Sequence, residues 1–199
     1  VKSMKLSLTV IAVFALVCAA AAVQCDSSGA SCPDGDTCCA TYGVPFYEAL
    51  AKLSPDYTWQ SSHIGGHRFA GTMFCFPHAL MYGRLDAKDA ADVLKSYSQG
   101  EILLDKYRGH AVGNNVLQAA GYFLRRETGR LGLADLSITG SQQVDDNNWT
   151  VDFSAGDGSS YRVGLSRSVS DYKLLKNCGD PESEWINMPR FSLTGIETA

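Results

Sequence analysis

Positive charge is scarce in this sequence, and nowhere does it gather into a run. The 199 residues include 17 Lys and Arg against 21 Asp and Glu, so the formal net charge is −4. Proteins that bind nucleic acid present a basic face to the phosphate backbone, and this composition therefore argues against a nucleic-acid partner. Internal repeats and long low-complexity linkers are also missing. The length and the 45% of hydrophobic residues indicate one domain of ordinary size, alone or with a short appendage.

A long apolar run stands near the start of the chain. Met4 is the expected start, and Lys5 is a minimal basic segment before the apolar run LSLTVIAVFALVCAAAA. Ala20 and Ala22 at the end of this run satisfy the small-residue rule for signal-peptide cleavage before Val23. We interpret residues 1–22 as a signal peptide. The alternative is a membrane anchor, since the run approaches the roughly 18–20 residues that a span needs. Its alanine-rich end and lack of flanking charge favour cleavage, after which no stable membrane span remains.

Cysteine becomes rare after residue 39, where only Cys75 and Cys178 follow. Residues 23–37 form a cysteine-rich stretch, and CPDGDTCC within and just after it resembles the opening of a granulin module. A granulin needs about a dozen cysteines, so a complete granulin is excluded. Behind a signal peptide, closely spaced cysteines normally form disulfides.

The chain from residue 38 onward has the mixed pattern of an α/β domain with a β-rich tail. Proline at a helix start, Asp86 as a helix cap and Gly100 and Gly129 as stops mark the helices, and alternating apolar residues mark the strands. We expect helices at 45–53, 87–99 and 114–127, and strands at 57–62, 72–77, 79–85, 149–153, 161–165 and 190–195. Cys75 is expected as a buried small hydrophobe, His78 in a turn and His110 in a loop.

The stretch QSSHIGGHRFAG, residues 60–71, places His63 and His67 around a pair of glycines. Each glycine would cost about 1 kcal/mol in a helix relative to alanine, which favours a loop in which both imidazoles can converge. Cys39 lies upstream, separated by one predicted helix and one predicted strand. Two cysteines and two histidines can bind either Zn²⁺ or a [2Fe–2S] cluster. Histidines satisfied by packing or solvent remain the alternative.

SSHIGGHRFAG, followed by PHALMYGRLD, closely resembles the sucrase/ferredoxin-like family of thioredoxin-like [2Fe–2S] proteins. The resemblance runs from Cys38-Cys39-Ala40 through GVPFYEAL and VLQAAGYFLRRETG to YRV…NCGDPES, and so defines a domain at 38–199. It implies an α/β, thioredoxin-like ferredoxin fold with a β-rich C-terminal extension. The granulin-like stretch occupies the place of the family's first strand, which puts that strand in question.

The same resemblance implies that Cys32, Cys39, His63 and His67 bind the cluster. The two histidines match the HxGGH motif, and Cys39 matches the second cysteine of the family's pair. Cys32 is the nearest candidate for the first, with six residues between the two cysteines in place of the family's eight. Arg68 would offset cluster charge or contact an acidic partner, or would be a plain surface arginine.

These observations predict a [2Fe–2S] electron-transfer protein that meets an unknown redox partner protein, since no separate nucleophile and base are evident for bond-making catalysis. Two alternatives stay open: a secreted disulfide-containing binding module without a cluster, and a structural zinc-binding protein. The signal peptide indicates the secretory pathway, whereas the family resemblance implies the cytosol or an organelle. The triplet NWT, 148–150, is an acceptor sequon that can be glycosylated only in the secretory pathway.

Overall fold

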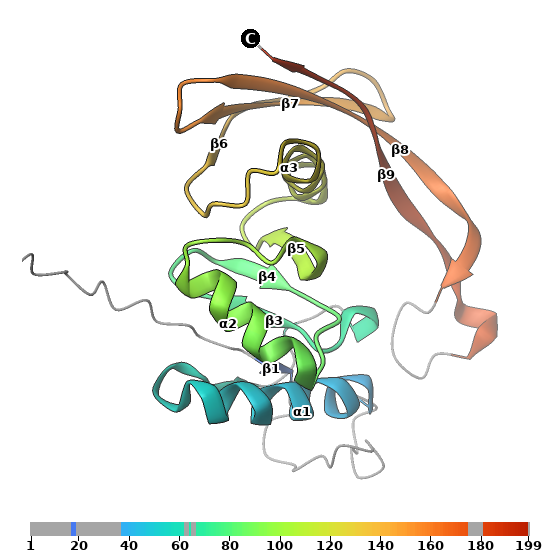
Figure 1. Ribbon diagram of the computed structural model, residues 1–199. Coiled ribbons are helices and arrows are strands. Elements are labelled where there is room, and N and C mark those ends of the chain that lie inside the picture. Colours follow the sequence, from blue (N-terminus) through green and yellow to red (C-terminus); the bar gives the residue numbers. More distant parts are fainter. Residues whose placement is uncertain (1–16, 19–36, 62–63, 65–66, 175–180, 199) are drawn as a thin grey trace, which may run out of the picture.

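The computed structural model describes residues 17–18, 37–61, 64, 67–174 and 181–198 and shows a mixed α/β protein, as predicted. Helices α1 (Thr37–Leu53) and α2 (Ala90–Ser98) lie beside a small sheet, and α3 (Asn115–Thr128) lies between that sheet and a larger, curved one (Figure 1). The specifically thioredoxin-like arrangement stays a prediction. Within the described ranges, no helix is long and apolar enough to cross a membrane.

The small sheet has the antiparallel order β3-β4-β5. Strands β3 (Met73–Cys75) and β4 (Leu80–Tyr82) confirm two predicted strands, joined by a turn that contains His78 as expected. Strand β5 (Tyr107–His110) was not predicted, and the expectation of a loop at His110 is wrong. The sequence YRGH is too short and too polar to show the alternation of a half-buried strand. Its pairing with β4 forms the strand.

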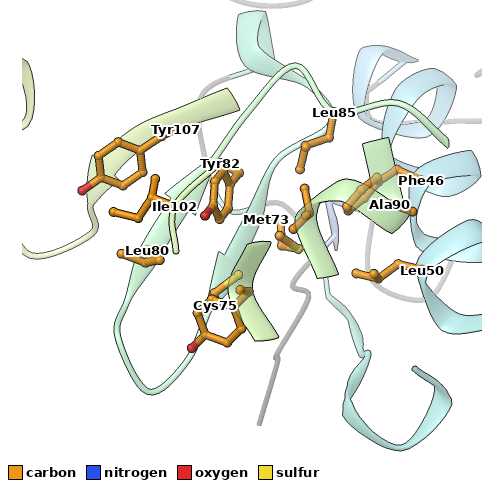
Figure 2. Packing of buried hydrophobic residues seen from close by; sticks show 12 residues of the cluster. Phe46, Leu50, Met73, Cys75, Leu80, Tyr82, Leu85, Ala90, Ile102 and Tyr107 are labelled. Atoms are coloured by element: carbon orange, nitrogen blue, oxygen red, sulfur yellow. The ribbon is translucent and has the colours of Figure 1, made fainter. Parts of the chain in front are cut away.

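The first hydrophobic core lies between this sheet and the helices α1 and α2 (Figure 2). Alternate residues of β3 and β4 are fully buried, as the two-residue period of a strand requires. Cys75 is one of them, which confirms its predicted role as a small buried hydrophobe. The buried members of this core are Phe46, Leu50, Met73, Cys75, Leu80, Tyr82, Leu85, Ala90, Val93, Tyr97, Ile102 and Tyr107.

Helix α2 begins as predicted from Asp86. The Asp86 carboxylate accepts a hydrogen bond from the Lys88 amide (3.0 Å), and the Asp89 carboxylate accepts one from the Asp86 amide (3.0 Å). This reciprocal capping box caps the short 3-10 helix η3 (Ala87–Asp89), which continues into α2. Gly100, with φ of +77°, follows the end of the helix as expected.

Helix α1 begins eight residues earlier than the predicted start at Pro45, which lies inside it. Proline is unfavourable there because it removes one backbone hydrogen bond. Burial of Cys39 and Ala40, each 2% exposed, accompanies the extra N-terminal turns and offsets this cost.

A short parallel pair lies next to α1. Strand β1 (Val17–Cys18) pairs with β2 (Gln60–Ser61), so two residues of the predicted signal peptide join the fold. The rest of residues 1–22 and most of the granulin-like stretch 23–37 lie outside the described residues. The domain boundaries predicted there stay predictions.

Helix α3 confirms the helix predicted at 114–127. The Asn114 side chain accepts a hydrogen bond from the Leu117 amide (3.0 Å), and Gly129 ends the helix at φ of 70°. One face of α3 packs on the larger antiparallel sheet, whose order is β6-β7-β8-β9. These strands are β6 (Leu136–Gln143), β7 (Asn148–Ala155), β8 (Ser160–Leu174) and β9 (Ile186–Thr198). The remaining 3-10 helices are η1 (Pro55–Tyr57), η2 (His67–Phe69), η4 (Leu104–Lys106) and η5 (Glu182–Glu184).

Candidate functional site

The four predicted cluster ligands are only partly within the described residues. Cys39 lies in the first turn of α1 and is 2% exposed. His67 opens η2, but its side chain is not described. Cys32 and His63 lie outside the described residues. The assignment of these four residues as ligands therefore stays a prediction.

The functional prediction needs correction. A [2Fe–2S] cluster requires four protein ligands, and so does a structural zinc ion. Among the residues whose positions are described, no group of three or more His, Cys, Asp or Glu side chains could hold a metal ion. The prediction of a [2Fe–2S] electron carrier is thus wrong for this part of the chain. The expectation of a redox partner protein, which depended on it, stays a prediction.

Other candidate side chains have structural roles. Burial raises the pKa of Cys75 far above that of an ordinary thiol, so the reactive thiolate is disfavoured. His78 Nδ1 lies 2.8 Å from the Tyr97 hydroxyl, which itself donates to the Phe76 carbonyl (2.9 Å). His110 Nδ1 lies 3.0 Å from the His78 carbonyl and must be its donor, since a carbonyl can only accept.

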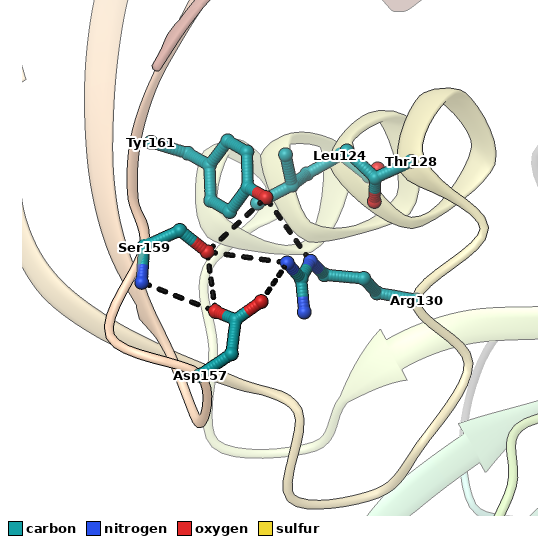
Figure 3. A network of polar contacts seen from close by, with 6 residues as sticks. All are labelled: Leu124, Thr128, Arg130, Asp157, Ser159 and Tyr161. Carbon is teal, nitrogen blue, oxygen red and sulfur yellow. Dashed lines mark hydrogen bonds and ion pairs between the residues drawn. The ribbon is translucent and has the colours of Figure 1, made fainter. Parts of the chain in front are cut away.

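A polar network ties the loop after α3 to the β7–β8 hairpin (Figure 3). Arg130 donates to Asp157 (2.6 Å) and to the Tyr161 hydroxyl (3.1 Å), while the Ser159 hydroxyl donates to Asp157. Hydrogen bonds from Ser159 and then Arg130 hold the pKa of Asp157 far below its usual range. A carboxylate so stabilised in its charged form is a poor proton acceptor. We therefore assign the network a structural role, in which it holds the hairpin to the loop after α3.

A different cluster collects three cations around one aromatic ring. The guanidinium carbons of Arg68, Arg84 and Arg108 lie 4.7, 5.5 and 3.9 Å from the centre of the Phe69 ring. Arg68 and Phe69 come from η2, Arg84 from the turn after β4, and Arg108 from β5. These distances are within the range of cation–π contacts.

The backbone around the β4 end explains this convergence. The Arg84 amide donates to the Phe69 carbonyl (2.7 Å), and the Gly83 amide donates to the Lys106 carbonyl (3.0 Å). A Cβ atom at Gly83 would lie 2.6 Å from the Arg108 side chain and 3.1 Å from the Phe69 Cβ. Glycine is therefore needed at this position for Arg108 to reach the ring.

The charges of the cluster are not balanced locally. Burial, and then the positive charges of Arg68 and Arg84, lower the pKa of Arg108 to about 10. Burial and Arg84 also lower the pKa of Arg68. The nearby Asp89 carboxylate is already paired with Lys106 at 2.7 Å. Within the described part of the chain, none of the three arginines forms an ion pair with a carboxylate.

The cluster opens onto a cleft of about 370 Å³ between η2, β5, α3 and β9. Arg68 and Arg108 line one side. Aromatic and apolar side chains from the helix and the larger sheet line the opposite side. The cleft residues are Arg68, Phe69, Tyr107, Arg108, Asn115, Gln118, Ala119, Tyr122, Phe123, Pro189 and Phe191.

Of these cations, only Arg68 was singled out from the sequence, as a possible contact for an acidic partner. Arg84 and Arg108 were not predicted, because neither stands in a sequence motif that indicates a binding site. Their approach to Phe69 depends on the pairing of β4 with β5 and on the contact between Gly83 and η2. A local sequence pattern carries no information about these contacts.

The description of the matching family is sucrase/ferredoxin-like, and its model covers residues 32–109. This confirms the resemblance to that family over the matched residues, which include Arg68, Phe69, Arg84 and Arg108. The chain is also similar to Altered inheritance of mitochondria protein 32 of Meyerozyma guilliermondii, with 38% identity over 60 residues. The match covers 28% of this chain and 21% of the relative, about a fifth of that protein's length.

Proposed function

We propose that this chain, sucrase/ferredoxin-like over residues 32–109, is a binding protein for a small organic anion. The observation that carries the proposal is the gathering of Arg68, Arg84 and Arg108 around Phe69 without a described carboxylate to balance them. The ligand would lie in the adjoining cleft of about 370 Å³, a volume typical of small-molecule sites.

The electrostatics favour an anion. Burying Arg108 and then bringing the other two guanidinium groups close to it both cost free energy, and both lower the pKa of Arg108. The face of the Phe69 ring offsets part of that cost, because its negative quadrupole attracts cations. A bound phosphate or carboxylate would offset more of it, since the guanidinium fork donates paired hydrogen bonds to either group.

The opposite wall of the cleft suggests what the anion is attached to. Tyr122 and Phe123 from α3, with Phe191 from β9, present aromatic surface across from the arginines. A planar ring could stack on these side chains while its charged group meets Arg68 and Arg108. A phosphorylated compound with an aromatic ring satisfies both walls.

Calorimetric titration with ATP at low salt tests this proposal. We expect ATP to bind, and Arg108→Gln to weaken it roughly 10- to 100-fold, since a hydrogen bond to a charged group contributes about 1.5–3 kcal/mol. The control is Arg162→Gln, an exposed β8 arginine that pairs with Asp152 and does not line the cleft. Inorganic pyrophosphate, which lacks a ring, should bind more weakly than ATP.

Three results would contradict the proposal: no heat with either anion, equal affinity in Arg108→Gln, or equal losses in the two variants. Thermal unfolding separates a lost site from a lost fold. Removing one of three mutually repelling charges should leave the unfolding midpoint of Arg108→Gln unchanged or slightly raised at low salt.

For the cellular compartment, the relative's name refers to the inheritance of mitochondria. We infer that this chain too works in association with mitochondria, in keeping with the organellar address that the family resemblance implied. The predicted signal peptide argues the other way. Glycosylation at the Asn148 sequon distinguishes the two compartments.

A further inference from the structure

We propose a second ligand site in the cavity between α3, β5 and the β6–β7 part of the larger sheet, fitted to a small amphipathic carboxylic acid. The carboxylate would meet Arg125, and the apolar body would lie against Leu136, Ile138 and Phe153. The cavity measures about 300 Å³, at the small end of the range for ligand pockets. This inference does not depend on the proposed anion cleft, although Tyr107 and Gln118 border both spaces.

Arg125 supplies the charge. Its side chain is almost fully buried, at 3% exposure, and one terminal nitrogen donates to the carbonyls of Arg130 (2.8 Å) and Gly132 (2.9 Å). These two bonds use one of the terminal nitrogens and fix the guanidinium beside the cavity. The nearby Asp135 carboxylate accepts from the Gly132 amide (2.7 Å) and forms no ion pair with Arg125.

Burial lowers the pKa of Arg125, and the attraction of the Asp135 carboxylate, which forms no ion pair with the guanidinium, offsets only part of that effect. Burying such a charge is unfavourable unless something pairs with it. A ligand carboxylate in the cavity would complete the hydrogen bonding and balance the charge.

The cavity follows one face of α3. Leu117, Gly121 and Arg125 are four residues apart, so they lie one above the other along the helix, and all three line the cavity. Gly121 stands in the middle of this row. A Cβ atom there would meet nothing within 4 Å, so the glycine leaves open space between an apolar and a charged side chain.

Packing does not explain this glycine. It lies in the interior of α3, where glycine disfavours the helix relative to alanine. Its φ is not in the left-handed region, and no neighbouring atom would collide with a methyl group. We therefore attribute the glycine to the space that a ligand in the cavity would need.

The wall of the cavity that β6 and β7 form is apolar, and the cavity opens to solvent at its edge. Phe153 is 3% exposed and forms the base, while Ile138 is 48% exposed and stands near the rim. Leu136 and Ile138 come from β6 and Phe153 from β7, paired directly with Ile138. An alkyl chain could enter past Ile138 and reach Arg125 with its carboxylate.

The test is titration with octanoate and with 1-octanol, which has the same chain length but no charge. We expect octanoate to bind at least tenfold more tightly than octanol. Gly121→Leu, which fills the cavity, should reduce octanoate affinity at least tenfold while the far-ultraviolet circular dichroism stays unchanged. Gly156→Leu is the matched control, because a Cβ at Gly156 also meets nothing within 4 Å and the residue does not line the cavity.

Failure to bind octanoate, equal affinity for octanol, or full octanoate binding by Gly121→Leu would each overturn the proposal. The two proposed sites can be told apart. Arg108→Gln should leave octanoate binding intact, and Gly121→Leu should leave ATP binding intact. Loss of octanoate binding in the control would show that the substitution acts through the fold and not through the cavity.

Discussion

The hydroxyl groups of Thr58 and Thr72 are buried, and neither has a hydrogen-bond partner among the described residues. Thr72, just before β3, is 1% exposed. A buried polar group without a partner costs about 1–3 kcal/mol, because it has given up its hydrogen bonds to water. Such a group reduces the stability of the first core.

We therefore predict that Thr72→Val raises the free energy of unfolding by about 1 kcal/mol. The matched control is Thr128→Val in α3, where the hydroxyl donates to the Leu124 carbonyl (2.6 Å) and its loss should not stabilise. Urea unfolding of both variants measures the difference. A fall in stability for Thr72→Val would mean that its hydroxyl has a partner beyond the described residues.

Individual residues were predictable where their role is local. Cys75 was expected to be buried because it stands in an apolar run, and Asp86 to cap a helix because apolar residues recur at helical intervals after it. The cation cluster was not predictable, since Arg68, Arg84 and Arg108 meet only after three separate segments pack together. The prediction of a [2Fe–2S] electron carrier was wrong for a similar reason, because residue types alone do not show which side chains lie close together in the fold.

At the level of elements, periodicity identified α2 and α3 well, and it identified β3 and β4. Strand β6 was not predicted, because six of its eight residues are exposed, and half-buried and exposed residues do not alternate along it. It forms because β7 pairs with all of its residues except Thr139. The early start of α1 was missed since Pro45 resembles a first-turn proline.

Strand β1 was also unexpected, since Val17 and Cys18 lie in the predicted signal peptide. The strand pairs in parallel with Gln60 and Ser61 of β2. We predict that deleting residues 1–22 lowers the unfolding midpoint, by roughly 2–4 °C for each kcal/mol of stability lost. Deleting only 1–14, which spares β1, is the control. Equal midpoints for the two truncations would show that β1 contributes nothing to stability.

The whole molecule has two hydrophobic cores, one around the small sheet and one between α3 and the larger sheet. Helix α3 borders both proposed ligand spaces, with the cleft on the η2 and β9 side and the cavity on the β6 side. The family match ends at residue 109, before α3 begins. Both proposed sites therefore join residues of the matched segment to residues outside it.

The compartment of the whole chain can be determined at Asn148, on the larger sheet. Its side-chain amide donates to both carboxylate oxygens of Asp145, at 2.9 and 2.8 Å. A glycan on that nitrogen would leave only one N–H for Asp145, so glycosylation would weaken this contact. In mitochondria the sequon would never meet the glycosylation machinery.

We accordingly predict that the full chain, expressed in a eukaryotic host, runs as one band that glycosidase treatment does not shift. Asn148→Gln, which removes the acceptor, should run at the same position. A glycosidase-sensitive band that vanishes in Asn148→Gln and persists in Thr150→Ser, which keeps the sequon, would place the chain in the secretory pathway. That result would reject the mitochondrial association. The two proposed ligand sites depend on the folded domain alone, so titration would still test them.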